Sequence, residues 1–192
     1  MKRSRKLILA GIFLAGTEFW DLSLVDPDNR RPVDFAERAR VLATTEKPDW
    51  QGLAREWPNG HLKLAWTRHL LRLRTELADV FANGGYEPLE VGGPHRDHVI
   101  AFARRRGRDA AIVAVAKSFA AFTQGGRSWP KGDAFDATLD IGGYSVQGFS
   151  VQGFAEADAA QLRLSDLFRD LPVAVLQARF VGALKPARAR PA

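Results

Sequence analysis

The pattern of apolar residues changes near residue 84, and this change limits the folds open to the chain. Before it, leucine and aromatic side chains recur at steps of three and four residues, which places them on one helical face. They are Leu62, Trp66, Leu70, Leu73, Leu77 and Phe81. Asn83, Gly84 and Gly85 then indicate a helix end. Beyond them lie six short runs with β propensity: 86–91, 98–104, 110–116, 137–141, 162–167 and 173–180. We therefore expect helices first and an antiparallel β-sandwich or barrel afterwards.

The part before this helix is expected to hold one more helix between two loops. Asp34 has the features of an N-cap, with Glu37 as its capping-box partner, so a helix is predicted to run to about Ala43. Residues 17–34 and 44–59 contain prolines and polar residues, and we predict that both are mostly loop.

The N-terminal 16 residues allow two interpretations. A basic start over residues 1–6 followed by an apolar run over 7–15 is typical of a signal peptide. The same run, bounded by Gly16, also fits a buried strand, and periodicity does not separate the two. It is too short to cross a bilayer as a helix. Cleavage near Ala15 would indicate secretion.

The net charge of +6 resides at the chain ends. Seven basic residues crowd the termini: Lys2, Arg3, Arg5, Lys6, Lys185, Arg188 and Arg190. Without them, 21 of the 28 basic residues remain, nearly balanced by 22 acidic ones. A nucleic-acid site needs a basic stripe on a folded face, so no nucleic-acid partner is expected, and no membrane partner either. The internal arginines around Gly107 are interpreted as a solvated hairpin tip.

Other candidate sites carry little weight. With no cysteine, disulfides and cysteine-ligated metals are excluded. The histidines have no third partner at metal-ligand spacing, so no metal is expected; they are His61, His69, His95 and His98. Four tryptophans are interpreted as packing residues: Trp50, Trp57, Trp66 and Trp129.

A five-residue repeat occupies residues 145–149 and 150–154, each copy reading Ser-Val-Gln-Gly-Phe. Strand side chains alternate with period two, so both copies cannot present the same residues to one face of a regular strand. We interpret the repeat as a slipped duplication in a loop or hairpin, expect it to bulge, and assign it no function.

Residues 16–34 carry the clearest indication of function. They combine carboxylates, an amide, paired arginines and the aromatic residues Phe19 and Trp20. Sugar sites use this mixture, because charged and amide groups bond hydroxyls and aromatic faces pack on apolar sugar faces. From chemistry alone, a proline-rich loop held by internal Asp–Arg pairs is the preferred interpretation.

The exact order of residues in this stretch changes that preference. Gly-Thr-Glu-Phe-Trp-Asp at 16–21 and Leu-Val-Asp-Pro-Asp-Asn-Arg-Arg-Pro-Val-Asp at 24–34 closely resemble the segment after the eighth barrel strand of maltooligosyltrehalose synthases, in the α-amylase superfamily. Residues 62–81 resemble the closing helix of that family, 85–102 the start of its C-terminal β-domain and 164–176 its end. The likeness begins near residue 11 and favours the strand interpretation of 7–16. Residues 12–15 depart from the family, which suggests a truncated or re-started reading frame.

The resemblance implies an α+β fold made of barrel remnant and sandwich. Residues 1–84 would hold the last strand and helices of a (β/α)8 barrel with the substrate-side loop. Residues 85–182 would form a C-terminal antiparallel β-sandwich, and 183–192 a disordered basic tail. By position, six residues would lie at the barrel's substrate face: Glu18, Asp26, Asp28, Asn29, Arg30 and Arg31.

The implied activity converts the reducing-end α-1,4 link of a maltooligosaccharide into an α,α-1,1 link, without a cofactor. In this superfamily the catalytic carboxylates come from barrel strands four, five and seven, so the chain holds no catalytic residue and is expected to be inactive alone, or active with a separate chain that supplies the rest of the barrel. A cytoplasmic location is expected. A stand-alone α-glucan-binding module and a secreted β-sandwich remain as alternatives.

Overall fold

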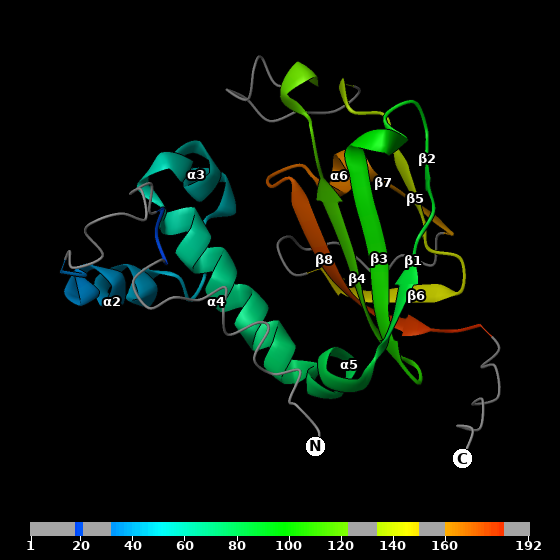
Figure 1. The fold of residues 1–192 in the computed structure, drawn as a ribbon, viewed down its shortest axis with the longest axis horizontal. Helices are drawn as coiled ribbons and strands as arrows, with labels where there is room; N and C mark the ends of the chain where they lie inside the picture. The colour runs from blue at the N-terminus through cyan, green and yellow to red at the C-terminus, as the bar shows by residue number, and fades with distance from the viewer. Residues whose placement is uncertain (1–17, 21–31, 123–133, 150–159, 183–192) are drawn as a thin grey trace, which may run out of the picture. The chain divides into compact units, whose positions relative to one another are not determined.

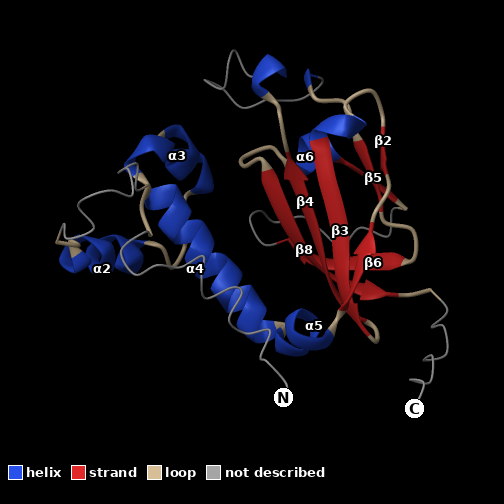
Figure 2. Ribbon diagram, viewed as in Figure 1, coloured by secondary structure: helices blue, strands red, loops and turns tan. Residues whose placement is uncertain are grey.

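The computed structural model describes residues 18–20, 32–122, 134–149 and 160–182 (Figure 1). Several predictions lie outside these residues: the apolar segment 7–16, Trp129, the second repeat copy and the tail 183–192. The chain divides into two compact units, Met1–Leu73 and Arg74–Ala192. Helices make up the first unit and antiparallel strands most of the second (Figure 2), so the α+β class is confirmed. None of the described helices is long and apolar enough to cross a membrane.

Helix α2 (Phe35–Thr44) begins where its N-cap predicts. The Asp34 carboxylate accepts the Glu37 backbone N–H at 2.8 Å, which satisfies a donor at the open helix end. The Glu37 carboxylate itself is bound by Arg40 at 2.7 Å. At the other end, Arg68 donates to the Leu42 carbonyl at 2.8 Å, so a cation stabilises the negative end of the helix dipole.

The prediction that residues 44–59 are mostly loop is wrong. They contain α3 (Trp50–Arg55) and the 3-10 helix η1 (Trp57–Asn59). Asp49 caps α3 by accepting the Gly52 N–H at 3.0 Å. Pro48 precedes this cap and Pro58 lies in the first turn of η1, two places where a missing N–H costs no helical hydrogen bond.

The helix predicted over 62–81 is two helices, α4 (His61–Glu76) and α5 (Ala78–Asn83), which meet at Leu77. The break allows α5 to pack on strand β3 and to bury Val80. The predicted stop after Asn83 is confirmed. A Cβ at Gly84 would lie 2.2 Å from the Val80 carbonyl oxygen, so only glycine fits where α5 passes into the sheet.

The larger sheet has five antiparallel strands in the order β1-β3-β4-β8-β6. Their bounds are β1 Gly85–Pro88, β3 Val99–Arg106, β4 Asp109–Ala116, β8 Val173–Phe180 and β6 Tyr144–Phe149. The strands predicted at 98–104, 110–116 and 173–180 are confirmed. The arginine-rich hairpin tip is also confirmed, because Arg106 pairs with Asp109 and two residues form the turn.

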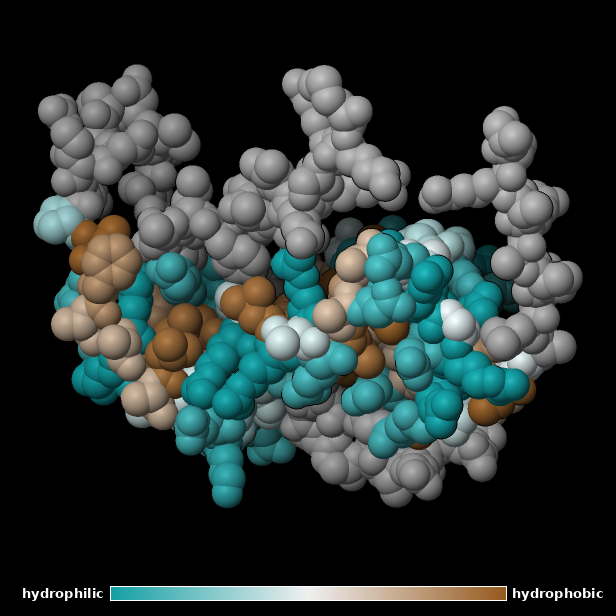
Figure 3. All heavy atoms as spheres, turned by 90° about the horizontal axis from the view of Figure 1, so that it is seen from below, coloured by the Kyte–Doolittle hydropathy of each residue, from teal (hydrophilic) through white to brown (hydrophobic). Residues whose placement is uncertain are grey.

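The smaller sheet holds β2 (Val91–Gly92), β5 (Thr138–Asp140) and β7 (Gln161–Arg163), again antiparallel. The second unit also contains the short helices η2 (Arg96–His98), η3 (Ala120–Phe122) and α6 (Leu164–Leu167). Side chains of both sheets share one core, which includes Ala101, Ile112, Leu139, Leu162 and Leu176. On the face seen in Figure 3, the hydrophobic side chains of the described residues lie in several separate groups.

Two predicted strands have different bounds. The run 86–91 is divided between β1 and β2. The run 162–167 is strand only to Arg163 and then becomes α6, which contradicts the prediction. Leu164 and Leu167 are both buried, a spacing that a helical turn satisfies. A continued strand would point Asp166 to the same face as Leu164, into the core.

The first repeat copy is part of strand β6, so the loop alternative is wrong and the hairpin alternative stays a prediction, while the predicted bulge is confirmed. Val146 pairs with Ala178, and Gly148 with the adjacent Gln177, which leaves Gln147 as the extra residue. The bulge thus lies within this copy, where β6 pairs with β8.

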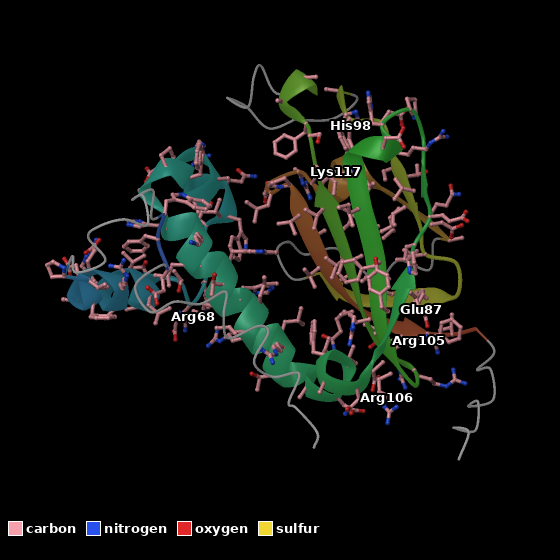
Figure 4. All side chains as sticks on the ribbon, in the orientation of Figure 1. Arg68, Glu87, His98, Arg105, Arg106 and Lys117 are labelled. Carbon is pink, nitrogen blue, oxygen red and sulfur yellow. The ribbon has the colours of Figure 1, made fainter. Side chains whose placement is uncertain are left out.

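A side-chain clasp joins the two edge strands of the larger sheet. Tyr144 of β6 donates to one Glu87 carboxylate oxygen on β1. Arg105 of β3 binds the other oxygen at 2.6 Å (Figure 4), and its guanidinium lies 4.3 Å from the centre of the Phe180 ring. The sheet therefore curls far enough for its edges to be bridged. We call Glu87, Arg105, Tyr144 and Phe180 the edge clasp.

Candidate functional site

The structure describes one of the six predicted substrate residues, Glu18. Asp26, Asp28, Asn29, Arg30 and Arg31 lie outside the described residues, and their role stays a prediction. The site is therefore built from Glu18, Phe19 and Trp20 and from the elements of the first unit that hold them.

Glu18 is oriented by helix α2. Its Oε2 accepts the Nε–H of Arg38 at 2.9 Å, with both side chains largely buried. The same guanidinium also donates to the Asp34 carbonyl at 3.0 Å. Arg38 thus ties the Glu18 carboxylate to the first turn of α2, and the orientation of this carboxylate depends on where that helix begins.

Phe19 is held through its backbone and by cations. Its carbonyl accepts Lys63 Nζ at 3.1 Å, and Arg38 lies 4.9 Å from its ring centre. Gly60, just before α4, has φ of +81°, and a Cβ there would meet the Phe19 Cβ and the Trp20 nitrogen at 2.9 Å. Glycine is needed both for the left-handed turn and for this close approach.

Trp20 meets Trp57 of η1 edge to face. The ring centres are 6.1 Å apart and the planes are inclined by 79°. The indole N–H of Trp20 donates to the backbone carbonyl of Trp57 at 2.6 Å. Lys63 Nζ lies 5.3 Å from the Trp20 ring centre. The pair is fixed, yet Trp20 is 43% exposed and Trp57 51%.

This exposure separates Trp20 and Trp57 from Trp50 and Trp66. Trp50 is only 7% exposed and packs edge to face on Trp66 at 5.5 Å, as the packing interpretation predicts. Trp57 does not fit that interpretation. A cue in the sequence was its place between Glu56 and Pro58, in a polar turn that has no apolar periodicity.

Acidic and basic groups next to Phe19 are paired. A hydrogen bond from Arg40 lowers the pKa of Glu37, an effect that desolvation opposes and that the charges of Arg40 and His61 reinforce. His61 lies 3.9 Å from Glu37 through Nε2 and also packs against the Phe19 ring. The cluster therefore presents oriented carboxylates, guanidinium groups and aromatic faces together, which suits a polyhydroxylated ligand.

The described residues contain no group of histidines and carboxylates that could hold a metal ion. His95 and His98 use their Nδ1 atoms on the backbone, at 2.8 Å from the Asp136 nitrogen and 3.1 Å from the Ser118 carbonyl. Figure 4 shows His98 at the opposite end of the sheet from Glu87 and Arg105. Both histidines support loops at the end of the second unit.

The contacts within the edge clasp shift the pKa values of Tyr144 and Glu87. Burial raises the pKa of the Tyr144 hydroxyl, and the hydrogen bond to Glu87 raises it further. Burial would raise the pKa of Glu87, but hydrogen bonds from Arg105 and Tyr144, with the charge of Arg105, lower it overall. The phenol keeps its proton and the carboxylate keeps its charge at neutral pH, so the clasp acts as a structural link and not as an acid–base pair.

No protein-family model matches the chain. Proteins described as maltooligosyl trehalose synthases in two strains of Mycobacterium tuberculosis are each 36% identical to it over 161 residues. This match covers 84% of the chain and 18% of each relative, so the chain spans about a fifth of their length. The structure of maltooligosyltrehalose synthase from Arthrobacter ramosus matches with a TM-score of 0.59 and 33% identity, and a mutant of that enzyme with 0.58 and 32%. Each covers 85% of the chain and 19% of the solved enzyme.

Proposed function

The chain is related to the C-terminal region of maltooligosyltrehalose synthases over most of its own length, and we propose that it supplies this region to an enzyme of the same activity. The enzyme would convert the reducing-end α-1,4 link of a maltooligosaccharide into an α,α-1,1 link. One observation carries the proposal: the sequence comparison and the structure comparison both match proteins described as this synthase, over 84% and 85% of the chain.

The chemistry would follow the retaining glycosidase scheme, with a carboxylate nucleophile and a carboxylic acid/base. The anomeric hydroxyl of the released glucose would then attack the glycosyl-enzyme in place of water. The resemblance assigns the catalytic carboxylates to barrel strands four, five and seven. The chain's own residues would bind and orient the substrate, and the chain would not isomerise maltooligosaccharides by itself.

The substrate contacts in this proposal come from the loop over residues 16–34. Glu18, Asp26, Asp28, Asn29, Arg30 and Arg31 would lie at the substrate face of a barrel whose last strand and helices are residues 1–84. Residues 85–182 would form the C-terminal sandwich. The pairing of Glu18 with Arg38 supports a division of roles, since a carboxylate already oriented by a guanidinium can position the loop and still accept from a hydroxyl.

A chimera tests the proposal. In the Arthrobacter ramosus synthase, the matched fifth of the chain is replaced by this chain, and loss of the maltopentaose reducing end is followed. We expect the chimera to regain activity that is absent when the matched segment is simply deleted. A chimera that folds, by circular dichroism and thermal unfolding, but makes no trehalose-ended product would contradict the proposed function.

The chain alone provides the second measurement. With maltopentaose we expect no loss of the reducing end. Clear loss, with a trehalose-ended product, would mean that catalytic carboxylates lie within these residues, and the proposed division of roles would be wrong.

A further inference from the structure

Two adjacent tryptophans are held rigidly at the surface of the first unit, and their exposure is the observation that calls for an explanation. A tryptophan side chain buries on the order of 150–250 Å² when it packs, so two that are 43% and 51% exposed leave a large apolar area in water. Single exposed apolar side chains are common, whereas contiguous apolar surface rimmed by polar residues is a feature of binding surfaces. We call Trp20 and Trp57 the indole corner.

The corner is set before any ligand arrives. The Trp20 indole N–H is anchored on the Trp57 backbone carbonyl at 2.6 Å, and the two rings stand edge to face. Gly60 brings the backbone of Trp20 against the start of α4, and Lys63 lies over the Trp20 ring. These side chains are already ordered in the free protein, so a ligand that contacts them loses little free energy by immobilising them.

The surroundings of the corner favour a polyol over an apolar partner. Lys63 already covers one aromatic face with an ammonium group that can donate to hydroxyls. Exposed polar neighbours of Trp57 are Glu56 and Asn59, and the Asn59 amide donates to the Glu56 carboxylate over a long 3.4 Å. An apolar peptide or lipid would strip water from this carboxylate and leave it only that long bond, whereas a sugar ring has an apolar face for the indole and a rim of hydroxyls that can replace the lost water.

We infer that the indole corner is a subsite that stacks one hexopyranose ring of an α-glucan on Trp57, with Trp20 and Lys63 at its side. This inference rests on the proposed function for the class of ligand and extends it to residues outside the six predicted ones. Glu18 lies two residues before Trp20 in the chain, so the corner would extend the same substrate-facing loop.

The test measures maltohexaose binding to the full chain by isothermal titration calorimetry. Trp57→Ala removes the stacking face but keeps the backbone carbonyl that anchors Trp20, so the fold of the corner is preserved. We expect this variant to weaken binding by about three- to tenfold, from the roughly 0.5–1.5 kcal/mol of an aromatic contact. Trp57→Phe should recover most of the affinity. Phe35→Ala removes a 60% exposed aromatic side chain of the same unit and should leave binding unchanged.

The outcomes separate the inference from the proposed function. Equal affinities for wild type and Trp57→Ala would overturn the subsite, as would an absence of maltohexaose binding to the wild-type chain. Neither result bears on the chimera, whose activity with maltopentaose decides the proposed function. An equal loss with Phe35→Ala would also overturn the subsite, because the effect would then be general to exposed aromatics.

Discussion

Removal of one oxygen atom from the edge clasp should measurably weaken the second unit. Tyr144 is 6% exposed and its hydroxyl donates to the Glu87 carboxylate, so Tyr144→Phe deletes a hydrogen bond to a charged acceptor and little packing. Such bonds contribute about 1.5–3 kcal/mol. We expect a value near the lower limit, because Glu87 keeps Arg105 as a partner and its side chain is 35% exposed. For a loss of about 1.5 kcal/mol and a urea dependence of about 1–3 kcal/mol/M, the midpoint should fall by roughly 0.5–1.5 M.

The chain offers a matched control. Tyr86→Phe makes the same change on β1 at a side chain that is 57% exposed, where the cost should stay below about 0.5 kcal/mol. Unfolding in urea is followed by the backbone amide resonances of the larger sheet in NMR spectra, because the described tryptophans and most of the helical residues lie in the first unit. Equal midpoints for Tyr144→Phe and Tyr86→Phe would refute the reasoning, since the clasp would then carry no free energy.

Three further changes probe single features. The pKa of Glu87 is lowered, so its contribution to stability is present above its ordinary pKa and is lost as pH falls through the folded-state pKa. The urea midpoints of wild type and Glu87→Gln should therefore converge in acid and diverge above about pH 5. A difference that stays constant with pH would contradict this. Asp34→Ala should cost about 0.5–2 kcal/mol of the stability of the first unit by tryptophan fluorescence in urea, and Asp34→Asn much less; equal losses would argue against capping. Gly60→Ala should lower the free energy of unfolding by more than about 1 kcal/mol, because φ is positive and an added Cβ would crowd Phe19 and Trp20. It should also alter the near-ultraviolet circular dichroism of the indoles. An unchanged spectrum and urea midpoint would contradict this close approach.

Local features of the fold were predictable from the sequence. Asp34 caps α2 through a hydrogen bond to a residue three positions on. Gly107 lies in the two-residue turn between β3 and β4, which pair with each other. Such interactions need only neighbouring residues, so short patterns contain them. Asp49 shows the limit of this approach, because the prolines around α3 obscured a cap that satisfies the same rule.

Features that depend on a distant partner were not predictable. The apolar stripe runs unbroken from Leu62 to Phe81, and the helix nevertheless breaks at Leu77, where α5 turns onto β3. Likewise, a β-prone run from Leu162 becomes helical because the core below it accepts Leu164 and Leu167 together. In each case tertiary packing overrides a local preference of about 1 kcal/mol or less per residue.

The same distinction between local and distant interactions applies to the candidate site. A motif could predict that Glu18 belongs to a substrate-side loop, but its pairing with Arg38 joins residues 20 positions apart and follows from the placement of α2. Trp50 and Trp57 are only seven positions apart and look alike in sequence. Trp50 follows a helix cap and meets Trp66 inside the unit, whereas Trp57 lies in a 3-10 turn, where its carbonyl accepts the Trp20 indole N–H and its ring remains half exposed. The distinction between a packing tryptophan and an exposed one therefore arises from the path of the backbone, and it is this path that turns Trp57 outward where a ligand can reach it.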